Sequence, residues 1–490
     1  MKTDLRPFLP ADVPGARNLA LGEARCPAPS VQEIIRGDAI KAPPVLTHEH
    51  YEYMGSEDID YSRYYSREFF EREIALIWKK TWQWACRVEH IPAPGDYYVY
   101  EVAHLSFLIV RTETGAIKAF HNSCMHRGTK LRASEGCGSA NELRCPYHGW
   151  TWSLSGELRR VPCAWDFAHV EPAKFKLDEA RVALWGGFVF INPSDDPMPF
   201  EEFIGVIPDH FKNWDLGNRY VELHMSKELP CNWKTAQEAF LESYHVLETH
   251  PQLLEGVGDA NVQYDIYGDH VSRFFAALGV NSPHLAEPLT EQQLLNKMLV
   301  GDRSVLGEDL TVKPGETARI VMARYLRKVL GAKYGADLSR FSDSEIIDTI
   351  EYSVFPNMFL FPGLSLPMVY RFRPLGLDPN RTLFEILFLR PVPDGGSRPA
   401  PAEVARVTEN ESYSTVPGFD PAFGHVYDQD TDNLRSAQQG FRAAKKKGAT
   451  LGNYQEIRIR HSQRTVDKYL NSTIRSAAAA APGGPRGNGH

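Results

Sequence analysis

The sequence predicts an α+β protein of two domains, in which a small β-rich domain precedes a larger domain of mixed strands and helices. The chain has 490 residues, which is more than a single hydrophobic core usually organises. Short β-favouring segments crowd the region between residues 98 and 191. A polar, proline-rich stretch at residues 193–199 then separates them from a region where helical periodicity alternates with further strands, and such a shift is typical of a domain boundary.

The composition disfavours several classes of partner and location. Hydrophobic residues make up 43% of the chain and charged residues 24%, as in ordinary globular proteins. The net charge of −8 argues against nucleic acid and anionic membranes as partners, because both attract an excess of Lys and Arg. No apolar run reaches the roughly 18 residues of a transmembrane helix, and residues 1–14 lack the apolar segment of a secretory signal. Seven cysteines are an odd number that argues against a disulfide framework, so we expect a cytoplasmic protein.

The first domain is expected to span residues 46–192, after an extended arm at residues 1–45 that is rich in Pro and Gly and has no sustained period. A helix is expected over residues 66–84, because its apolar residues share one face: Phe70, Ile74, Ile77 and Trp78. The β-favouring segments that follow lie at residues 98–111, 116–121, 152–158 and 182–191. They predict the small β domain.

The second domain is expected to span residues 193–475. A helix is predicted over residues 232–250, and two further helices begin at capping boxes, which pair Thr290 with Gln293 and Ser342 with Glu345. Strands are predicted at residues 353–361, 367–373 and 382–389, and a last amphipathic helix at 456–470. The tail, residues 476–490, is rich in Ala, Gly and Pro and is predicted to be disordered.

A first set of chemically active residues combines two cysteines with two histidines. Cys124 and His126 form a Cys-x-His pair, and Cys145 and His148 form a Cys-x-x-His pair 18 residues further on. Two thiolates and two imidazoles on short loops are typical of a metal site. Tetrahedral zinc is one assignment, and a Rieske [2Fe–2S] cluster with both Cys on one iron and both His on the other is the second. Zinc sites more often pair Cys with Cys, so the mixed pairs favour the cluster.

A second set combines two histidines with carboxylates. On the predicted helix Glu238, Glu242 and His245 lie within about 60° of one another, and polar groups on a buried helix face need partners or a metal. Pro251 disfavours helical backbone at His250, so the chain can turn His250 back towards His245. Two His and one carboxylate form the facial triad of non-haem Fe(II) oxygenases, which leaves open coordination positions.

The segment Cys145-Pro-Tyr-His-Gly-Trp resembles the cluster-binding signature of Rieske proteins. Residues 238–251 are similar to the mononuclear iron motif of ring-hydroxylating oxygenase alpha subunits, and the resemblance extends to residues 185–192 and 355–357 and covers most of the chain. It implies a Rieske domain and a catalytic domain with a helix-grip fold. It also implies a [2Fe–2S] cluster bound by Cys124, His126, Cys145 and His148.

The resemblance further implies a mononuclear Fe(II) held by His245, His250 and an Asp near the C-terminal end. Asp430 best matches the family pattern, with Asp428 and Asp432 as alternatives. An opposing interpretation is that Asp430 or Asp432 is the N-cap of a helix that begins at about Leu434.

Glu242 departs from the family pattern. The family carries a carboxylate three residues before the first iron His, usually Asp, and in the family's homotrimer it bridges the cluster of one subunit to the iron of the next. Here that position is Glu242. Members with Glu there include oxygenases that act on carnitine-like quaternary amines.

These features predict the terminal component of a multicomponent oxygenase that uses O₂ to hydroxylate a small, aromatic organic substrate. The alternatives are action on a quaternary amine, O- or N-demethylation, a pure electron carrier, or a zinc-stabilised binding protein. The chain has no Gly-x-Gly-x-x-Gly dinucleotide motif, so a separate ferredoxin or NAD(P)H-dependent reductase must supply electrons. A homotrimer is expected, and a beta subunit is left open. The candidate pocket residues, which serve equally well as core, are Phe240, Tyr244, Phe355, Phe359 and Phe423.

Overall fold

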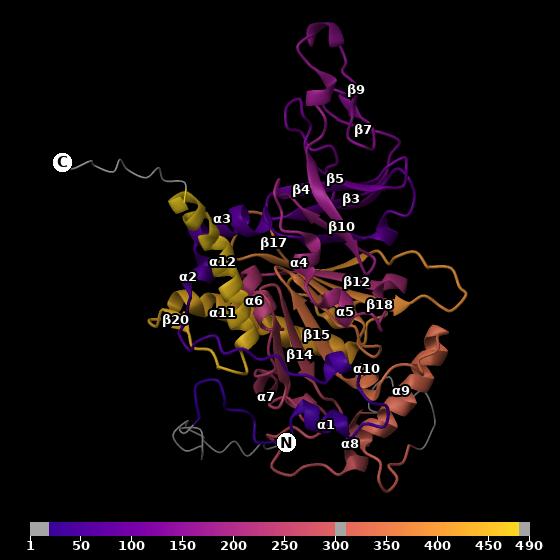
Figure 1. Ribbon diagram of the computed structural model, residues 1–490, viewed down its shortest axis with the longest axis vertical. Helices are drawn as coiled ribbons and strands as arrows, with labels where there is room; N and C mark the ends of the chain where they lie inside the picture. The colour runs from indigo at the N-terminus through magenta and orange to yellow at the C-terminus, as the bar shows by residue number, and fades with distance from the viewer. Residues whose placement is uncertain (1–18, 299–309, 480–490) are drawn as a thin grey trace, which may run out of the picture.

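The computed structural model describes residues 19–298 and 310–479, with side chains as far as residue 471. The molecule is elongated, with a β-rich domain at one end and a larger domain of sheet and helices below it (Figure 1). This is the predicted α+β class. Among the residues described, no helix combines the length and the apolar character that crossing a membrane requires.

The β-rich domain is built on a seven-stranded sheet with the order β2-β11-β10-β5-β4-β3-β6. Its strands are β2 (Gln83–Arg87), β3 (Asp96–Val102), β4 (Leu105–Arg111), β5 (Ile117–His121), β6 (Gly136–Ser139), β10 (Glu179–Trp185) and β11 (Phe188–Asn192). The predicted single strands 98–111 and 182–191 are each a hairpin instead. In the second hairpin Gly186 and Gly187 have φ of 57° and 80°, a backbone that favours glycine and that allows the chain to reverse there.

A second, three-stranded sheet forms the tip of this domain (Figure 1). It contains β7 (Leu143–Arg144), β8 (Thr151–Trp152) and β9 (Leu158–Arg160). The predicted hairpin at residues 152–158 corresponds to β8 and β9, with Gly156 at φ 85° in the turn. This small sheet carries one of the two cysteine–histidine loops.

The leading helix is shorter than predicted. It comprises α3 (Arg67–Glu73) and one π-helical turn, Ile74–Trp78, because the chain has to enter β2 at Gln83. Its predicted apolar face is buried as expected, in a core that joins the two domains. The expected extended arm contains one short helix, α1 (Val31–Arg36), and its residues 1–18 lie outside the described part.

The larger domain is built on an eight-stranded sheet with the order β13-β14-β15-β16-β17-β18-β12-β19. Its strands are β12 (Arg219–Leu229), β13 (Gln263–Tyr267), β14 (Val271–Ala276), β15 (Thr349–Val354), β16 (Met358–Leu360), β17 (Met368–Pro374), β18 (Thr382–Pro391) and β19 (Val404–Val407). Neighbours are antiparallel except for β12 and β19. The predicted strands at residues 367–373 and 382–389 are confirmed as β17 and β18, whereas the predicted strand 353–361 is the hairpin of β15 and β16 instead. Strands β12 to β14 and β19 were not predicted.

Helices pack on this sheet. The helices that carry or neighbour the predicted iron ligands are α6 (Trp233–Glu238), α7 (Val246–Thr249), α11 (Pro421–Ala443) and α12 (Ile457–Ala479). The other helices of this domain include α8 (Glu291–Met298), α9 (Ala318–Tyr334) and α10 (Asp343–Ile347) (Figure 1). The predicted capping boxes are confirmed before α8 and α10. Helix α12 extends beyond its predicted end, so residues 476–479 of the expected disordered tail are helical, and residues 480–490 lie outside the described part.

The predicted continuous helix over residues 232–250 is wrong. The chain leaves the helical path after α6, and residues 239–245 form an irregular connection to the short α7. Tertiary partners satisfy the backbone there: the Ser243 N–H donates to the Tyr264 hydroxyl at 3.0 Å, and Arg458 donates to the Leu241 carbonyl at 3.4 Å. Backbone groups that find such partners no longer need the helical hydrogen-bond ladder.

Candidate metal centres

The two cysteine–histidine loops have the same backbone design. Cys124 follows β5 and Cys145 follows β7, and each begins a turn that ends in glycine four residues later. Gly128 and Gly149 have φ of 76° and 73°, and their N–H groups donate to the carbonyls of Cys124 and Cys145 at 2.9 and 3.2 Å. The repeated turn holds each thiol and the imidazole that follows it at the same end of the loop.

The two loops bring the four predicted cluster ligands together. Cys124 and Cys145 are buried, with 4% and 2% exposed, and neither forms a disulfide. The rings of His126 and His148 lie 4.7 Å apart between centroids. Nδ1 of His126 is buried and has no hydrogen-bond partner among the described residues, which is costly unless a metal accepts its lone pair. Two soft thiolates and two imidazoles therefore fit a Rieske cluster.

Aromatic side chains support the histidine side of this centre. The His126 ring stacks on Trp150 at 5.0 Å and almost in parallel, with an interplanar angle of 2°. Tyr147 lies beside His148 at 3.7 Å, and it is 57% exposed. The centre is therefore packed on one side and reaches the molecular surface on the other.

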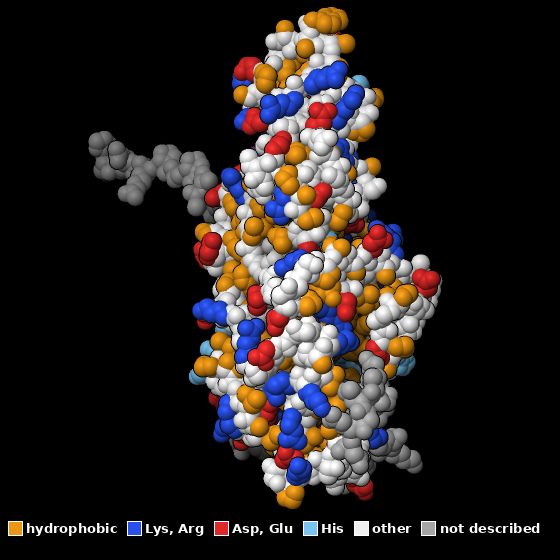
Figure 2. All heavy atoms as spheres, turned by 90° about the vertical axis from the view of Figure 1, so that its right-hand side faces the viewer, with side chains coloured by type: hydrophobic (Ala, Val, Ile, Leu, Met, Phe, Trp, Pro, Cys, Tyr) orange, Lys and Arg blue, Asp and Glu red, His pale blue; other side chains and the backbone are white. Residues whose placement is uncertain are grey.

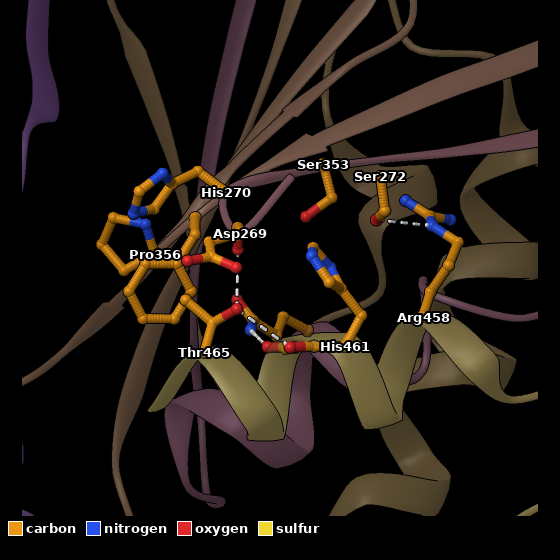
Figure 3. Close-up of a pocket in the computed structure, with 11 residues that line it drawn as sticks. Asp269, His270, Ser272, Ser353, Pro356, Arg458, His461 and Thr465 are labelled. Carbon is orange, nitrogen blue, oxygen red and sulfur yellow. Dashed lines mark hydrogen bonds between the residues drawn. The ribbon is translucent and has the colours of Figure 1, made fainter. Parts of the chain in front are cut away.

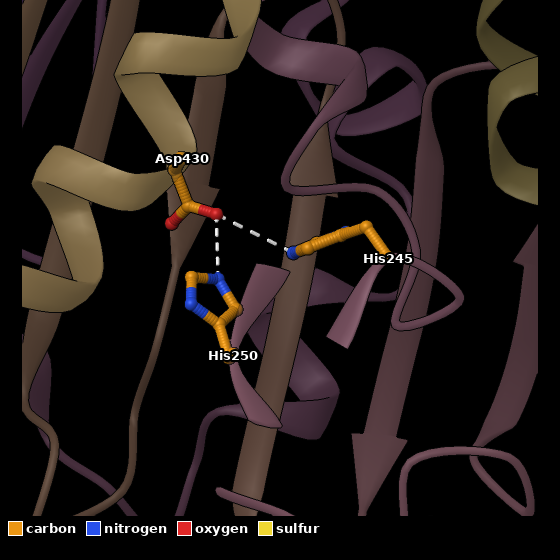
Figure 4. A group of neighbouring side chains, drawn as sticks. All are labelled: His245, His250 and Asp430. Atoms are coloured by element: carbon orange, nitrogen blue, oxygen red, sulfur yellow. Dashed lines mark hydrogen bonds and ion pairs between the residues drawn. The ribbon is translucent and has the colours of Figure 1, made fainter. Parts of the chain in front are cut away.

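The second centre joins two segments that are distant in the sequence, one that flanks α7 on each side and one on α11. His245 precedes α7, His250 follows it, and Asp430 projects from α11 (Figure 4). Asp430 Oδ1 lies 2.7 Å from His250 Nε2 and 3.4 Å from His245 Nε2. One donor atom from each residue lies within 4.8 Å of the others. The backbone of His250 is not helical, with φ −126° and ψ 54°, as predicted from Pro251.

The arrangement favours Asp430 over Asp428 and Asp432 as the third metal ligand. Asp428 accepts hydrogen bonds from the Ser412 hydroxyl and from the Tyr413 N–H, and Lys227 lies 3.9 Å from it. Asp432 is exposed. The alternative that an Asp caps a helix near Leu434 is wrong, because α11 begins at Pro421 and Asp420 is its N-cap.

Glu242 is in contact with His245. Its Oε1 lies 2.7 Å from Nδ1 of His245, and its Oε2 accepts the His245 backbone N–H at 3.0 Å. A carboxylate in this position fixes the tautomer and the orientation of a metal-binding imidazole. Glu238 does not share this face, contrary to the prediction, because the helix breaks between the two residues. It accepts hydrogen bonds from Tyr64 and Gln463 instead.

The charges of the site suit a cation. Burial lowers the pKa of His245, but the carboxylates of Glu242 and Asp430 outweigh it and raise that pKa to about 10 in the metal-free protein. The same contacts to the two imidazoles hold the pKa of Asp430 below its usual value, although burial alone would raise it. A metal that binds here must displace the proton of His245, so its affinity rises with pH.

A small polar cavity lies between α12 and the sheet (Figure 3). Its volume of about 10 Å³ is room for about one water molecule. The residues that line it include Gln237 from α6, His270 and Ser272 from the sheet side, and Arg458 and His461 from α12. Burial lowers the pKa of both His270 and His461 to about 4, so both stay neutral at pH 7. We assign this cavity a packing role.

Only part of the predicted pocket lies near the second centre. Phe240, Phe359 and Phe423 belong to an apolar cluster between strands β16 to β18 and helix α11. Phe355 packs in the core between the domains, and Tyr244 is 65% exposed. The alternative of core packing therefore holds for Phe355, and Tyr244 lies at the surface.

Tyrosines complete the aromatic cluster on the side of Asp430. Tyr427 precedes Asp430 by three residues on α11, so the two share a helix face, and its hydroxyl is hydrogen-bonded to that of Tyr370. The Tyr413 hydroxyl is buried without a hydrogen-bond partner among the described residues. The sequence analysis missed these three residues, because tyrosines spread over strand, loop and helix leave no local pattern.

Two comparisons identify related domains. A model of the ring hydroxylating alpha subunit catalytic domain matches residues 211–472, and a model of the Rieske [2Fe-2S] domain matches residues 81–171. The first match begins before β12 and ends in α12, so it contains all three residues of the second centre. The second contains all four residues of the first centre.

Individual relatives cover smaller parts. The glycine betaine monooxygenase oxygenase subunit of Pseudomonas aeruginosa is 31% identical over 192 residues, which is 39% of this chain and 44% of that protein. The large oxygenase component of salicylate 5-hydroxylase from Ralstonia sp is 31% identical over 205 residues, 39% of this chain and 48% of that protein. The chain therefore spans about half the length of the curated relatives it matches.

A solved structure of a quaternary ammonium Rieske monooxygenase shares the fold. It superimposes with a TM-score of 0.59 at 17% identity, over 88% of this chain and 100% of the solved one. At this identity the likeness concerns the fold alone.

Proposed function

Since this chain belongs to the ring hydroxylating alpha subunit family, we propose that it is the terminal oxygenase component of a multicomponent Rieske oxygenase. The observation that carries the proposal is the pair of centres in one chain: Cys124, His126, Cys145 and His148 for the cluster, and His245, His250 and Asp430 for iron. A pure electron carrier has no use for the second centre, and a zinc-stabilised binding protein needs neither the second centre nor its open coordination positions.

The metal ligands, Glu242 and the aromatic cluster have different roles in the proposed reaction. When bound, the two metal groups supply electron storage and O₂ activation. Asp430 and one ring nitrogen each of His245 and His250 would hold the iron. Glu242 accepts a hydrogen bond from Nδ1–H of His245 and so keeps Nε2 directed at the metal position. The aromatic cluster beside Asp430 limits water near the reaction and packs against substrate.

The substrate that this site suits best is a small aromatic molecule. Phe240, Tyr370 and Tyr427 form part of a ring cluster on the Asp430 side, and their faces stack on aromatic rings. A quaternary amine is the second candidate, because ring faces also attract organic cations. Glu242 and the glycine betaine relative favour that candidate.

An external protein is the proposed electron donor, either a ferredoxin or an NAD(P)H-dependent reductase. Lys and Arg side chains lie at the upper end of the molecule, where the β-rich domain lies, with acidic side chains between them, and others lie over the lower half (Figure 2). In the β-rich domain Arg144 and Arg160 line a surface cavity around the Cys145–Gly149 loop, and Arg127 lies over the ring of Tyr147. Positive charge of this kind attracts an acidic donor and accelerates its association.

The chain is proposed to act as a homotrimer in the cytoplasm, with a beta subunit left open. The cluster loops lie at one end of the molecule and α7 lies far down the other domain (Figure 1), so direct transfer inside one chain would have to cross the length of the protein. Exposed aromatics beside both centres, Tyr147 and Tyr244, suit contacts between copies. The seven cysteines are free, as in a reducing compartment.

The test is product formation with a substrate panel. Purified, iron-loaded protein should consume O₂ when it receives electrons from a ferredoxin and reductase pair, and it should hydroxylate or demethylate at least one member of a panel of aromatic acids, aromatic hydrocarbons and quaternary amines. Mass spectrometry of the products after reaction under ¹⁸O₂ identifies the inserted oxygen. If no panel member gives a labelled product, although the protein is loaded and reduced, the proposed function is wrong.

A further inference from the structure

The two iron-proximal histidines are oriented by chemically different partners. Nδ1 of His245 faces the carboxylate of Glu242, whereas Nδ1 of His250 lies 3.0 Å from the amide oxygen of Gln429. In His250 the other ring nitrogen, Nε2, is the one that lies 2.7 Å from Asp430. An amide oxygen only accepts hydrogen bonds. Gln429 therefore selects the tautomer in which Nδ1 carries the proton and the Nε2 lone pair faces the metal position.

A second glutamine holds the first. Nε2 of Gln252 donates to the same oxygen of Gln429 at 2.6 Å. Gln429 directly precedes Asp430 on α11, and Gln252 follows His250 by two residues. Each segment that carries an iron-proximal residue thus contributes one glutamine, and the two amides connect the segments beside the metal position.

His250 needs such a contact more than His245 does. It is the residue between α7 and the turn that starts at Pro251, and its backbone is neither helical nor extended. The two flanking turns hold its backbone, through hydrogen bonds with Val246 and Leu253, and the orientation of its ring depends on side-chain partners. A carboxylate at residue 429 would restrain the ring equally well, but it would add a negative charge. With neutral Gln429, the charges of Fe(II), Asp430 and Glu242 cancel.

We propose that Gln429, held by Gln252, is the positioning residue for His250: it fixes the Nδ1–H tautomer and keeps this side of the iron site uncharged. The proposal rests on the iron site of the proposed function. It goes beyond that function because it assigns the affinity of the site to residues that bind neither metal nor substrate.

Metal titration of protein that keeps its cluster but lacks the mononuclear iron tests this without turnover. Co(II) is the probe, because its visible absorption reports both affinity and ligand geometry. Gln429→Leu has a similar volume and no acceptor, and we expect it to bind Co(II) about 10- to 100-fold more weakly, as is usual when such a partner is lost. Gln429→Glu restores the acceptor and should recover affinity to within a few-fold of the wild type. The cluster absorbance should be the same in all variants.

Asn433→Ala is the matched control. Asn433 lies one turn further along α11, and its Nδ2 donates to Thr249 Oγ1 on α7 and to the backbone carbonyl of Gln429, both at 3.3 Å, so it connects α11 to α7 without touching a histidine ring. We expect normal Co(II) affinity. Equal weakening in Asn433→Ala and Gln429→Leu, or normal affinity in Gln429→Leu, would overturn the positioning role while the iron site stands. If the wild type itself binds no Co(II), the proposed function fails as well.

Discussion

His250→Ala should lose the mononuclear iron and fall to background turnover while the cluster absorbance stays at its wild-type level. His250 is 2% exposed, and its Nε2 lies 2.7 Å from Asp430, so its removal deletes one of three convergent ligand positions. Asp430→Asn should have a similar effect, because an amide is a far weaker ligand for Fe(II) than a carboxylate. Metal analysis gives iron per chain, and the visible spectrum reports the cluster separately.

Asp428→Asn is the control for this prediction. Asp428 lies two residues from Asp430 on the same helix, but its carboxylate is engaged with Ser412 and Tyr413. We expect it to retain iron and most of the turnover. The opposite result, with iron lost in Asp428→Asn and kept in Asp430→Asn, would mean that Asp428 is the iron ligand and Asp430 is not. Loss of the cluster together with the iron in His250→Ala would mean that the variant is misfolded or that the two centres are not separate.

The second large effect concerns Glu242 and the transfer of electrons between copies of the chain. Glu242→Gln should keep both metal contents near normal and lose most of its turnover, because it removes the charge that faces His245 while it keeps a hydrogen-bonding group there. If Glu242 only oriented His245, the Glu242→Gln variant would keep its turnover, because the amide oxygen still accepts a hydrogen bond from Nδ1.

Mixed trimers separate transfer between copies from transfer within a copy. Cys145→Ser removes the cluster and His245→Ala removes the iron, so each variant alone is inactive. In an equal mixture half of the clusters and half of the irons are intact, and about one interface in four of a cyclic trimer then pairs an intact cluster with an intact iron. We therefore expect about a quarter of wild-type turnover. If mixed trimers form and show only background turnover, transfer occurs within one chain.

Local patterns predicted much of both centres. Cys124, His126, Cys145 and His148 lie in two short segments, and each loop is determined by residues within five positions of its cysteine. The effect of Pro251 on His250 is equally local, and the backbone angles of His250 agree with it. The ligand roles themselves stay predictions, but the proximity of these side chains is a property of the structure.

The remaining features depend on contacts that are distant in the sequence. The predicted helix over residues 232–250 breaks because Tyr264 and Arg458 satisfy its backbone, and neither lies in the segment itself. The assignment of Asp430 rather than Asp428 as the iron ligand depends on where α11 begins and on the hydrogen bond between Asp428 and Ser412. Gln429 and Gln252 are 177 positions apart, so no spacing within a single segment could indicate that they meet.

The measurement that tests the central claim most directly is the electron paramagnetic resonance spectrum of the purified, reduced protein. The account predicts the low average g value of a [2Fe–2S] cluster with two histidine ligands, because His126 and His148 replace two of the four thiolates of an ordinary cluster. The Cys145→Ser variant should lose the signal. A spectrum typical of four cysteine ligands, or one zinc per chain with no signal at all, would contradict the account.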